Sequence, residues 1–284
     1  MFGYCSLAQA KEEHKAFNTT DDDKLMRCIN HASRRIDKIM NKRGLMAAFG
    51  PNNKAIKFPL STRYVNSENN SFLLRGAPPL LAITSAAVDT TSITTVIEGY
   101  PQGEPWFKQV RITSDGDNWY SYCDSYNPSY LILTGVWGYH NDYDNAWLNV
   151  GTLSAEMLAG AASFTVADVD GDDAYGFPDK ISRGMLVKID SEYMLITATD
   201  STTQVSSVKR SMLGTTAALH TIGSVVYRWE TEEPIQRIVA RQAGLLYAKR
   251  GAYQVDTMDG MGSVSYPQDL LPELKHALAE YINS

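Results

Sequence analysis

A short run of carboxylates is the first feature that could do chemistry. Four aspartates fall between residues 168 and 173, and carboxylate oxygens are ligands that Ca²⁺ prefers. An EF-hand loop requires glycine at its sixth position and a bidentate glutamate at its twelfth. Here Gly171 stands at the fourth position and Asp179 at the twelfth. The pattern favours a solvated acidic turn, with a surface ion site as the alternative, and we assign no metal ligands.

The remaining reactive side chains do not form a known catalytic pattern. No histidine stands in an HxH or HExxH pattern, no CxxC is present, and both GxSxG and the P-loop are missing from the sequence. Asp142 and Asp144 could serve glycoside hydrolysis, but aspartates are common in turns. We therefore predict no catalytic residue, no cofactor and no enzymatic activity; a hydrolase of the cell wall is the minor alternative. The histidines and cysteines are His14, His31, His140, His220, His276, Cys5, Cys28 and Cys123.

Aromatic side chains are concentrated between residues 106 and 147. In β structure such residues are often core or cross-strand pairs. They could also form a sugar-binding platform or a protein interface, because Tyr and Trp are enriched among interface anchors. Under the sugar-binding alternative, Trp119 and Trp137 would be the binding residues.

Composition limits the class of protein. The chain has 284 residues, of which 44% are hydrophobic and 20% charged, so it can bury a core. Its net charge of −6 does not favour wrapping of nucleic acid, although residues 1–50 carry nine Lys/Arg against six Asp/Glu. No apolar run is long enough to cross a membrane, and we find no signal peptide. We expect the protein to be made and used in a cytoplasm, or released by lysis.

Helical periodicity marks both ends of the chain. Apolar residues recur at helical spacing from Leu25 to Ile39, after an acidic cap at residues 21–23 and before Gly44. A shorter helix is predicted over residues 6–17. A third begins at Pro234, a residue that suits the first helical turn. After a Gly-rich stretch, a short amphipathic helix is predicted from about residue 269.

The sequence between residues 51 and 228 predicts many short strands. Val, Ile, Thr and Tyr alternate there with Gly, Asn, Asp and Pro. A hairpin is expected where residues 185–189 and 192–197 flank Asp190 and Ser191. Regular short strands with turns between them suggest a small barrel or sandwich. The other predicted strands are residues 62–65, 71–74, 82–88, 94–98, 109–113, 130–139, 164–166, 204–209 and 224–229.

These elements predict an α+β fold class. A helical bundle from the N- and C-terminal segments would carry a long antiparallel β insertion and an extended C-terminal arm. The predicted parts are an N-terminal helical segment (1–57), a first β-rich region (58–148), a second β module (149–228), a helix completing the base (229–252) and the arm (253–284).

Several short segments together resemble the head–tail connector (adaptor) proteins of tailed bacteriophages. The stretch TGVWGYH at residues 134–140 is the most specific of them. This chain departs from the simplest members by its long β insertion. The other similar segments are YCSL (4–7), DDD (21–23), SRRID (33–37), FP (58–59), TRY (62–64), GYP (99–101), EPW (104–106), residues 185–196, RSMLGTTAALH (210–220), PQDL (267–270) and Leu274.

The resemblance implies a structural virion protein at the neck, assembled in the host cytoplasm. The subunits would form a ring of about twelve copies that docks to the portal. The ring would extend the DNA channel, without sequence-specific DNA binding, and join the next neck or tail component: a stopper, tail terminator or tail tube. The alternative function is a tail-associated protein that binds carbohydrate on the host surface.

Contact residues follow from this interpretation. The helical stripes would supply subunit contacts around Ile29, Ile36, Ile238 and Leu245. The arm would contact the portal, because a segment with anchoring apolar residues can fold on binding. Its predicted anchors are Tyr253, Tyr266, Leu270, Leu271 and Leu274.

Overall fold

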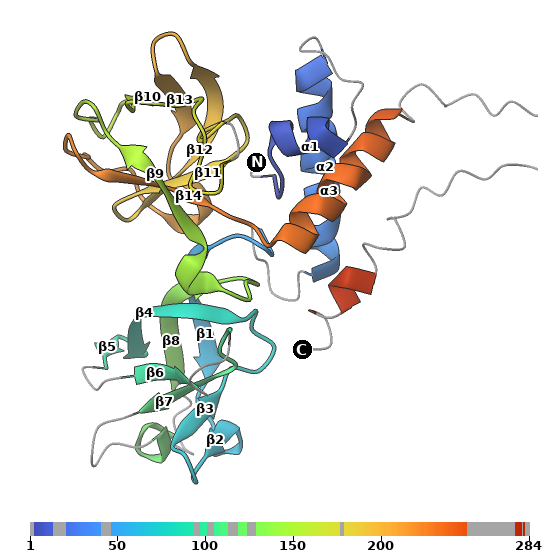
Figure 1. Ribbon diagram of the computed structural model, residues 1–284. Helices are drawn as coiled ribbons and strands as arrows, with labels where there is room; N and C mark the ends of the chain where they lie inside the picture. The colour runs from blue at the N-terminus through green and yellow to red at the C-terminus, as the bar shows by residue number, and fades with distance from the viewer. Residues whose placement is uncertain are drawn as a thin grey trace, which may run out of the picture. The chain divides into compact units, whose positions relative to one another are not determined.

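The computed structural model divides the chain into two compact units, which are described separately (Figure 1). The first β unit comprises residues 41–147 with 213–215, and the helix-containing unit comprises residues 1–40, 148–212 and 216–284. The structure describes residues 3–13, 21–40, 47–93, 97–100, 105–112, 119–123, 129–176, 179–248, 276–279 and 281.

The part of the first β unit that the structure describes contains two antiparallel sheets of four strands each. In one, β8 lies between β1 and β4, with Asn52 opposite Trp137 at one end of the β1–β8 pair. This sheet has the order β1 (Asn52–Pro59), β8 (Tyr130–Trp137), β4 (Leu80–Val88) and β5 (Thr91–Ser92). The other has the order β2 (Val65–Asn66), β3 (Ser71–Leu73), β7 (Gln109–Ile112) and β6 (Ile97–Tyr100).

Four large aromatic rings pack among aliphatic side chains in the core of the first β unit. Phe72 packs against Trp119 with ring centroids 5.5 Å apart, and Phe58 packs against Trp137 at 6.2 Å. All four side chains are buried. Gly135 is required beside them, because a Cβ atom there would lie 2.3 Å from the carbonyl oxygen of Ala82 on β4. The TGVWGYH stretch therefore supplies the buried ring of Trp137, and at Gly135 its backbone lies too close to β4 to allow a side chain.

In the described residues, the helix-containing unit holds three α-helices and a six-stranded antiparallel sheet. The helices are α1 (Leu7–Glu13), α2 (Asp22–Met40) and α3 (Glu233–Ala248), and a further helical turn covers residues 276–279. The sheet order is β10 (Ser163–Thr165), β13 (Val205–Lys209), β12 (Glu192–Asp200), β11 (Leu186–Ile189), β14 (Val225–Trp229) and β9 (Trp147–Thr152). We call this sheet with its loops, residues 148–229, the second β module.

Local signals explain how α1 begins and where it packs. The Ser6 hydroxyl accepts a hydrogen bond from the Gln9 amide (3.1 Å), and the Gln9 side chain accepts one from the Ser6 amide (2.8 Å). This reciprocal pair is a capping box, which satisfies two amides at the helix start. Gln9 also donates a hydrogen bond to Gln236 of α3, and Glu13 at the end of α1 pairs with Arg241 of α3. Side-chain contacts therefore join α1 to α3 at two points.

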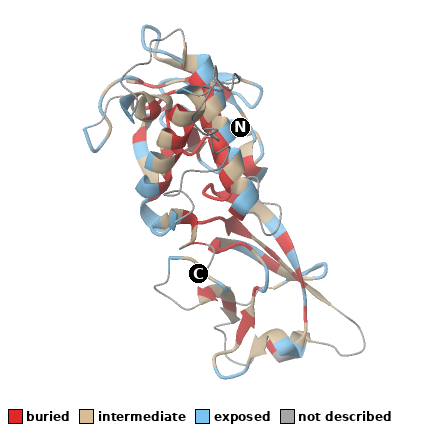
Figure 2. Cartoon of the chain, turned by 90° about the vertical axis from the view of Figure 1, so that its right-hand side faces the viewer, coloured by how far each residue is buried: buried red, intermediate tan, exposed pale blue. Residues whose placement is uncertain are grey.

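Residues just before α1 are fixed on α2. The amide of Tyr4 donates a hydrogen bond to the Ser33 hydroxyl (3.0 Å), and the Tyr4 phenol donates one to Asp37. Tyr4 is 1% exposed. Buried residues of α2 lie on one side of the helix and exposed residues on the other (Figure 2). The apolar periodicity that predicted α2 thus marks the side of the helix that faces the core.

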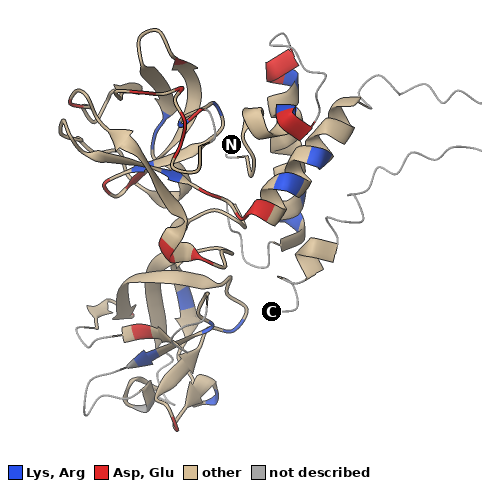
Figure 3. Ribbon diagram, viewed as in Figure 1, with Lys and Arg blue, Asp and Glu red and all other residues tan. Residues whose placement is uncertain are grey.

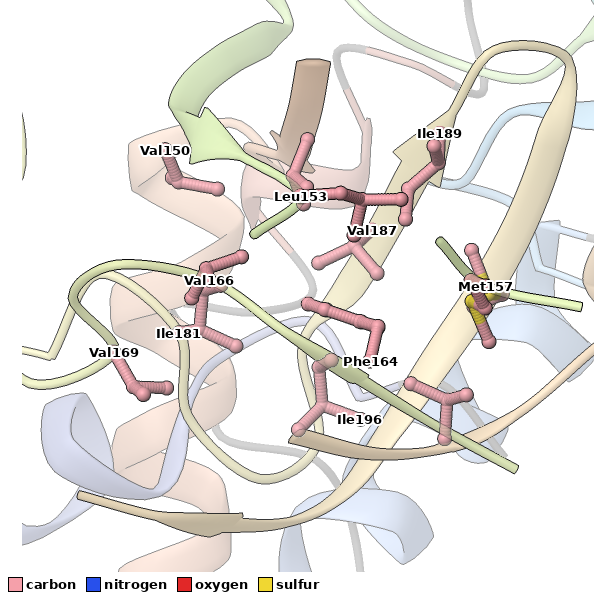
Figure 4. Close-up of a cluster of buried hydrophobic side chains, with 13 residues drawn as sticks. Val150, Leu153, Met157, Phe164, Val166, Val169, Ile181, Val187, Ile189 and Ile196 are labelled. Carbon is pink, nitrogen blue, oxygen red and sulfur yellow. The ribbon is translucent and has the colours of Figure 1, made fainter. Parts of the chain in front are cut away.

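The second β module has an aliphatic core. Side chains from β9 to β14 and the loops between them form one cluster, with Phe164 near its middle (Figure 4). The predicted hairpin is confirmed: β11 and β12 pair antiparallel, and Asp190 in their turn has a φ of 51°. The left-handed conformation at Asp190 suits a tight hairpin turn.

The predicted α+β class with a helical bundle and a β insertion is wrong. The described residues contain fourteen strands in three antiparallel sheets, whereas α1, α2 and α3 have 7, 19 and 16 residues. The amphipathic helices gave a concentrated sequence signal, while the β signal was spread over short segments. Burial lies mainly in the sheets, so the chain is mostly β. None of the helices that the structure describes is both long and apolar enough to cross a membrane.

Candidate functional site

The predicted contact residues fall in two groups. Ile29 and Ile36 of α2 are 0% exposed, so their side chains serve the core of the single chain. Ile238 and Leu245 of α3 are half-buried and present part of their surface. Assignment of these four to a subunit interface stays a prediction. The predicted portal contacts, Tyr253, Tyr266, Leu270, Leu271 and Leu274, lie outside the described residues.

The acidic run at residues 168–173 is held by cations and amides of the chain itself. Asp168 accepts hydrogen bonds from Lys180 (2.6 Å) and from the Gly171 amide (2.8 Å), and these donors hold its pKa below the usual range. Asp173 pairs with Arg228 at 2.8 Å, and both side chains are buried. Within the described part of the chain, no three His, Cys, Asp or Glu side chains gather closely enough to hold a metal ion.

The tryptophans named for the sugar-binding alternative are core residues. Trp119 and Trp137 are both 0% exposed. Each indole N–H donates to a backbone carbonyl, that of Val110 (3.1 Å) or Lys54 (2.9 Å). Neither ring face is therefore available to stack on a sugar.

A buried network of charged side chains lies at the β11–β12 hairpin. Glu192, the first residue of β12, has a fully buried side chain. Its two oxygens accept hydrogen bonds from Arg210, at 2.9 Å from Nε and 2.5 Å from Nη2. The amides of Ser211 (3.2 Å) and Ala218 (3.0 Å) also donate to this carboxylate. Such a bidentate pair with additional donors satisfies a buried charge.

His220 closes the network on its other side. Its Nε2 lies 3.0 Å from Oε2 of Glu192, and its Nδ1 lies 2.7 Å from Oδ2 of Asp190. The imidazole is 1% exposed, whereas the Asp190 side chain is 57% exposed. Because both nitrogens face carboxylate oxygens, both contacts are hydrogen bonds only when the ring carries two protons.

The electrostatics of Glu192 argue against acid–base catalysis. Burial alone would raise its pKa, but hydrogen bonds from Arg210, Ala218, His220 and Ser211 outweigh burial and lower the pKa to about 2. A carboxylate with so low a pKa is a poor general base near neutral pH. Both of its oxygens are already occupied by donors of the chain. The network therefore holds the backbone of the surrounding loops in place.

Arg210 and His220 fix two loops beside each other. The Arg210 guanidinium donates from Nη1 to the carbonyls of Leu158 (2.6 Å) and Ala159 (2.8 Å), and from Nη2 to that of Ala218. Met157 and His220 exchange two backbone hydrogen bonds, each 2.9 Å long. We call residues 157–163 and 216–224 the paired loops.

The paired loops present apolar side chains to solvent. Met157 and His220 point inward and are each 1% exposed, so their antiparallel neighbours Leu158 and Leu219 point outward. Leu158 is 58% exposed, Leu219 is 51% exposed and Ile222 is 67% exposed. Neither loop contains Lys, Arg, Asp or Glu, although 20% of the chain is charged. Figure 3 shows where the charged residues lie elsewhere on the chain.

This composition is typical of the centre of a protein–protein interface. Interface cores are depleted in charge, and apolar side chains exposed together mark interaction sites. Rigid loops also lose less conformational entropy on binding than mobile ones. The paired loops are therefore the candidate functional site, as a contact surface held by the network of Glu192, Arg210 and His220.

Sequence reasoning did not identify this site. The sequence patterns gave no functional role to Glu192, Arg210 or His220. An available signal was the run of residues 211–227, directly after Arg210, which contains no Lys, Arg, Asp or Glu. Long uncharged runs in surface loops are informative because loops are usually polar.

Comparison with known proteins gives no relative from which a function can be transferred: no family model matches this chain, and no curated protein matches it significantly.

Proposed function

We propose that this chain is a head–tail connector (adaptor) subunit of a tailed bacteriophage, a non-enzymatic protein that forms a ring beneath the capsid portal. The ring, of about twelve copies, extends the DNA channel and links it to the next neck or tail component. The protein is located at the virion neck after assembly in the host cytoplasm.

The observation that carries the proposal is the surface of the paired loops. A rigid, uncharged and apolar surface suits stable contact with another protein. Leu158 and Leu219 are neighbours across the Met157–His220 pair, and Ile222 is exposed in the same loop as Leu219. The resemblance adds a second observation. Tyr4 of the YCSL segment donates hydrogen bonds to Ser33 and Asp37 of the SRRID segment. Two segments that carry the resemblance therefore form one contact.

The proposal assigns a different partner to each surface. Subunit contacts fall on the terminal helices, where Ile238 and Leu245 retain exposed surface. Portal contact is assigned to residues 253–274, which include Tyr253 and Leu270. The paired loops then contact the downstream neck or tail protein.

Locating the chain in particles tests the function. Cryo-electron microscopy of particles and isolated necks, with this chain labelled, is expected to place a closed ring directly below the portal. A position at the tail tip or on the capsid faces would overturn the proposal.

A pair of variants tests the assignment of the paired loops. Leu158→Asp combined with Leu219→Asp places charge on exposed positions, so the fold is retained. The ring should still form below the portal, and attachment of the downstream component should be lost. Tyr175→Asp is the matched control, because Tyr175 is 67% exposed in the same module but lies outside the paired loops. Equal tail attachment by both variants would contradict the assignment.

A further inference from the structure

One side of α2 carries a stripe of exposed cationic residues. Five positions at spacings of three and four residues share this side, and all five are exposed. On an α-helix they fall within a sector of about 80° and extend over about 21 Å. The members of this cationic stripe are Lys24, Arg27, His31, Arg34 and Lys38.

Charge is strongly segregated between α2 and the remaining chain. The whole of α2 has five Lys/Arg and three Asp, a net charge of +2, and residues 24–40 beyond its first two aspartates carry +4, whereas the whole chain carries −6. The acidic side chain within residues 24–40 is that of Asp37, which accepts a hydrogen bond from Tyr4 and lies outside the stripe. Figure 3 shows Lys and Arg recurring along α2 beyond its acidic first turn. The net charge of the protein therefore conceals a local positive surface.

We propose that the cationic stripe of α2 binds the phosphate backbone of double-stranded DNA, without reading sequence. This inference rests on the proposed function, in which DNA passes through a ring of these subunits. Duplex DNA carries one negative charge per roughly 1.7 Å of its axis, so the stripe faces a continuous row of phosphates. Lys and Arg side chains are the usual contacts to that backbone.

The spacing of the stripe favours a polyanion over an acidic protein surface. The stripe contains no acidic residue between Lys24 and Lys38, so its ligand must present negative charge repeatedly along about 21 Å. A second copy of this chain offers a poorer match. Among the described residues, the largest group of carboxylates close together in sequence is the run at residues 168–173, and Asp168 and Asp173 in that run are already paired with Lys180 and Arg228.

A contact of this kind is compatible with DNA movement. Phosphate contacts are independent of sequence, so a DNA-binding protein that relies on them can slide along the duplex. The stripe would hold the duplex electrostatically while leaving it free to translocate.

The test is the salt dependence of DNA binding by the full-length protein. A fluorescent 30-base-pair duplex of arbitrary sequence is titrated with protein, and anisotropy is measured between 50 and 200 mM NaCl. If each of the four permanently charged residues of the stripe neutralises one phosphate, raising the NaCl concentration over this range should lower the affinity about 150-fold. The variant Arg27→Gln/Arg34→Gln/Lys38→Gln should bind more weakly at 50 mM and lose only about 3-fold over the same range.

A matched variant separates the stripe from net charge. Arg63→Gln/Lys108→Gln/Lys209→Gln removes the same charge from exposed positions elsewhere and should bind like the unmodified protein. All substituted residues are exposed, and circular dichroism verifies that both variants are folded. Equal loss of affinity in both variants, or no binding by the unmodified protein at 50 mM, overturns the inference.

Two outcomes show whether the DNA-binding inference or the proposed connector function has failed. If the stripe variant binds DNA normally but no longer forms rings, the stripe is a protein interface and the inference is wrong. If the stripe binds DNA while microscopy places the chain away from the neck, the DNA contact stands and the connector function fails.

Discussion

The two β regions of this chain are stabilised by different means. The core of the first β unit packs four aromatic rings among aliphatic side chains, and its ion pair between Arg111 and Glu98 is about one third exposed. The second β module has an aliphatic core but buries the pair Glu192–Arg210, with side chains 0% and 10% exposed. Ring shape therefore specifies the packing in one region, whereas charge geometry specifies the loops in the other.

Removing a core ring should have the largest effect. Trp137→Ala leaves a large cavity beside Phe58 and removes the hydrogen bond that the indole N–H donates to the Lys54 carbonyl. We expect a loss of about 3–5 kcal/mol in the free energy of unfolding. Urea unfolding followed by tryptophan fluorescence and by circular dichroism measures it.

The control for that substitution keeps an aromatic ring. Trp137→Phe preserves most of the apolar contact, so its loss should be clearly smaller. A change below about 1 kcal/mol for Trp137→Ala would be incompatible with a structural role for this ring.

Breaking the buried ion pair should have the next largest effect. Arg210→Met leaves Glu192 buried without its bidentate partner and releases the carbonyls of Leu158 and Ala159. We expect a loss of roughly 3 kcal/mol, at the lower end for a broken buried pair because two amides still donate to Glu192. Thermal unfolding monitored by circular dichroism gives the difference.

A double variant distinguishes a broken pair from lost packing. In Glu192→Leu/Arg210→Met neither charge remains buried, so stability should recover in large part. The paired loops should nevertheless lose their fixed position, because Arg210 no longer holds the Leu158 carbonyl. Faster hydrogen exchange at residues 157–163 in the double variant would reveal this. Protection unchanged from that of the unmodified protein would refute the positioning role.

Sequence patterns predicted individual helices and strands better than they predicted how much of the chain is helical and how much is β. The apolar period between Leu25 and Ile36 predicted α2, and Asp190 predicted the β11–β12 turn. The strand predicted at residues 62–65 is wrong at its start, because Thr62–Tyr64 forms a 3₁₀ helix. The strand β1 was not predicted, because it pairs with β8 more than 70 residues later and its polar start hides the pattern. Pairing across such separations is absent from any local window.

The candidate site was hidden for the same reason. Arg210 and His220 are separated from Glu192 by 18 and 28 residues, respectively. A lone histidine in a turn gives no indication of burial, because its partners lie on other strands. The exposed apolar residues of the paired loops are also ordinary until the fold places Leu158 beside Leu219.

Acid should weaken the contribution of Glu192. Its pKa is lowered to about 2 in the folded protein, below the ordinary value of 4.5. The ionised carboxylate therefore stabilises the fold fully above about pH 4.5, and this stabilisation is lost as the pH falls towards 2. Unfolding free energies of the unmodified protein and of Glu192→Gln, measured between pH 6 and 2.5, should converge as the pH falls. A constant difference between the two proteins would mean that Glu192 does not titrate with folding.

The exposed ion pair of the first β unit should show the smallest effect. Glu98 and Arg111 face each other across β6 and β7, and solvent reaches about one third of each side chain. Arg111→Met should cost about 1 kcal/mol or less at low salt, and less still in 1 M NaCl, because salt screens an exposed pair. The corresponding change in Arg210→Met should depend little on salt, because water and ions do not reach Glu192. Measured together in urea at both salt concentrations, the two variants compare charge at the surface with charge in the core. Equal salt dependence would show that the second β module does not shield its ion pair, and that the paired loops owe their position to something other than Arg210.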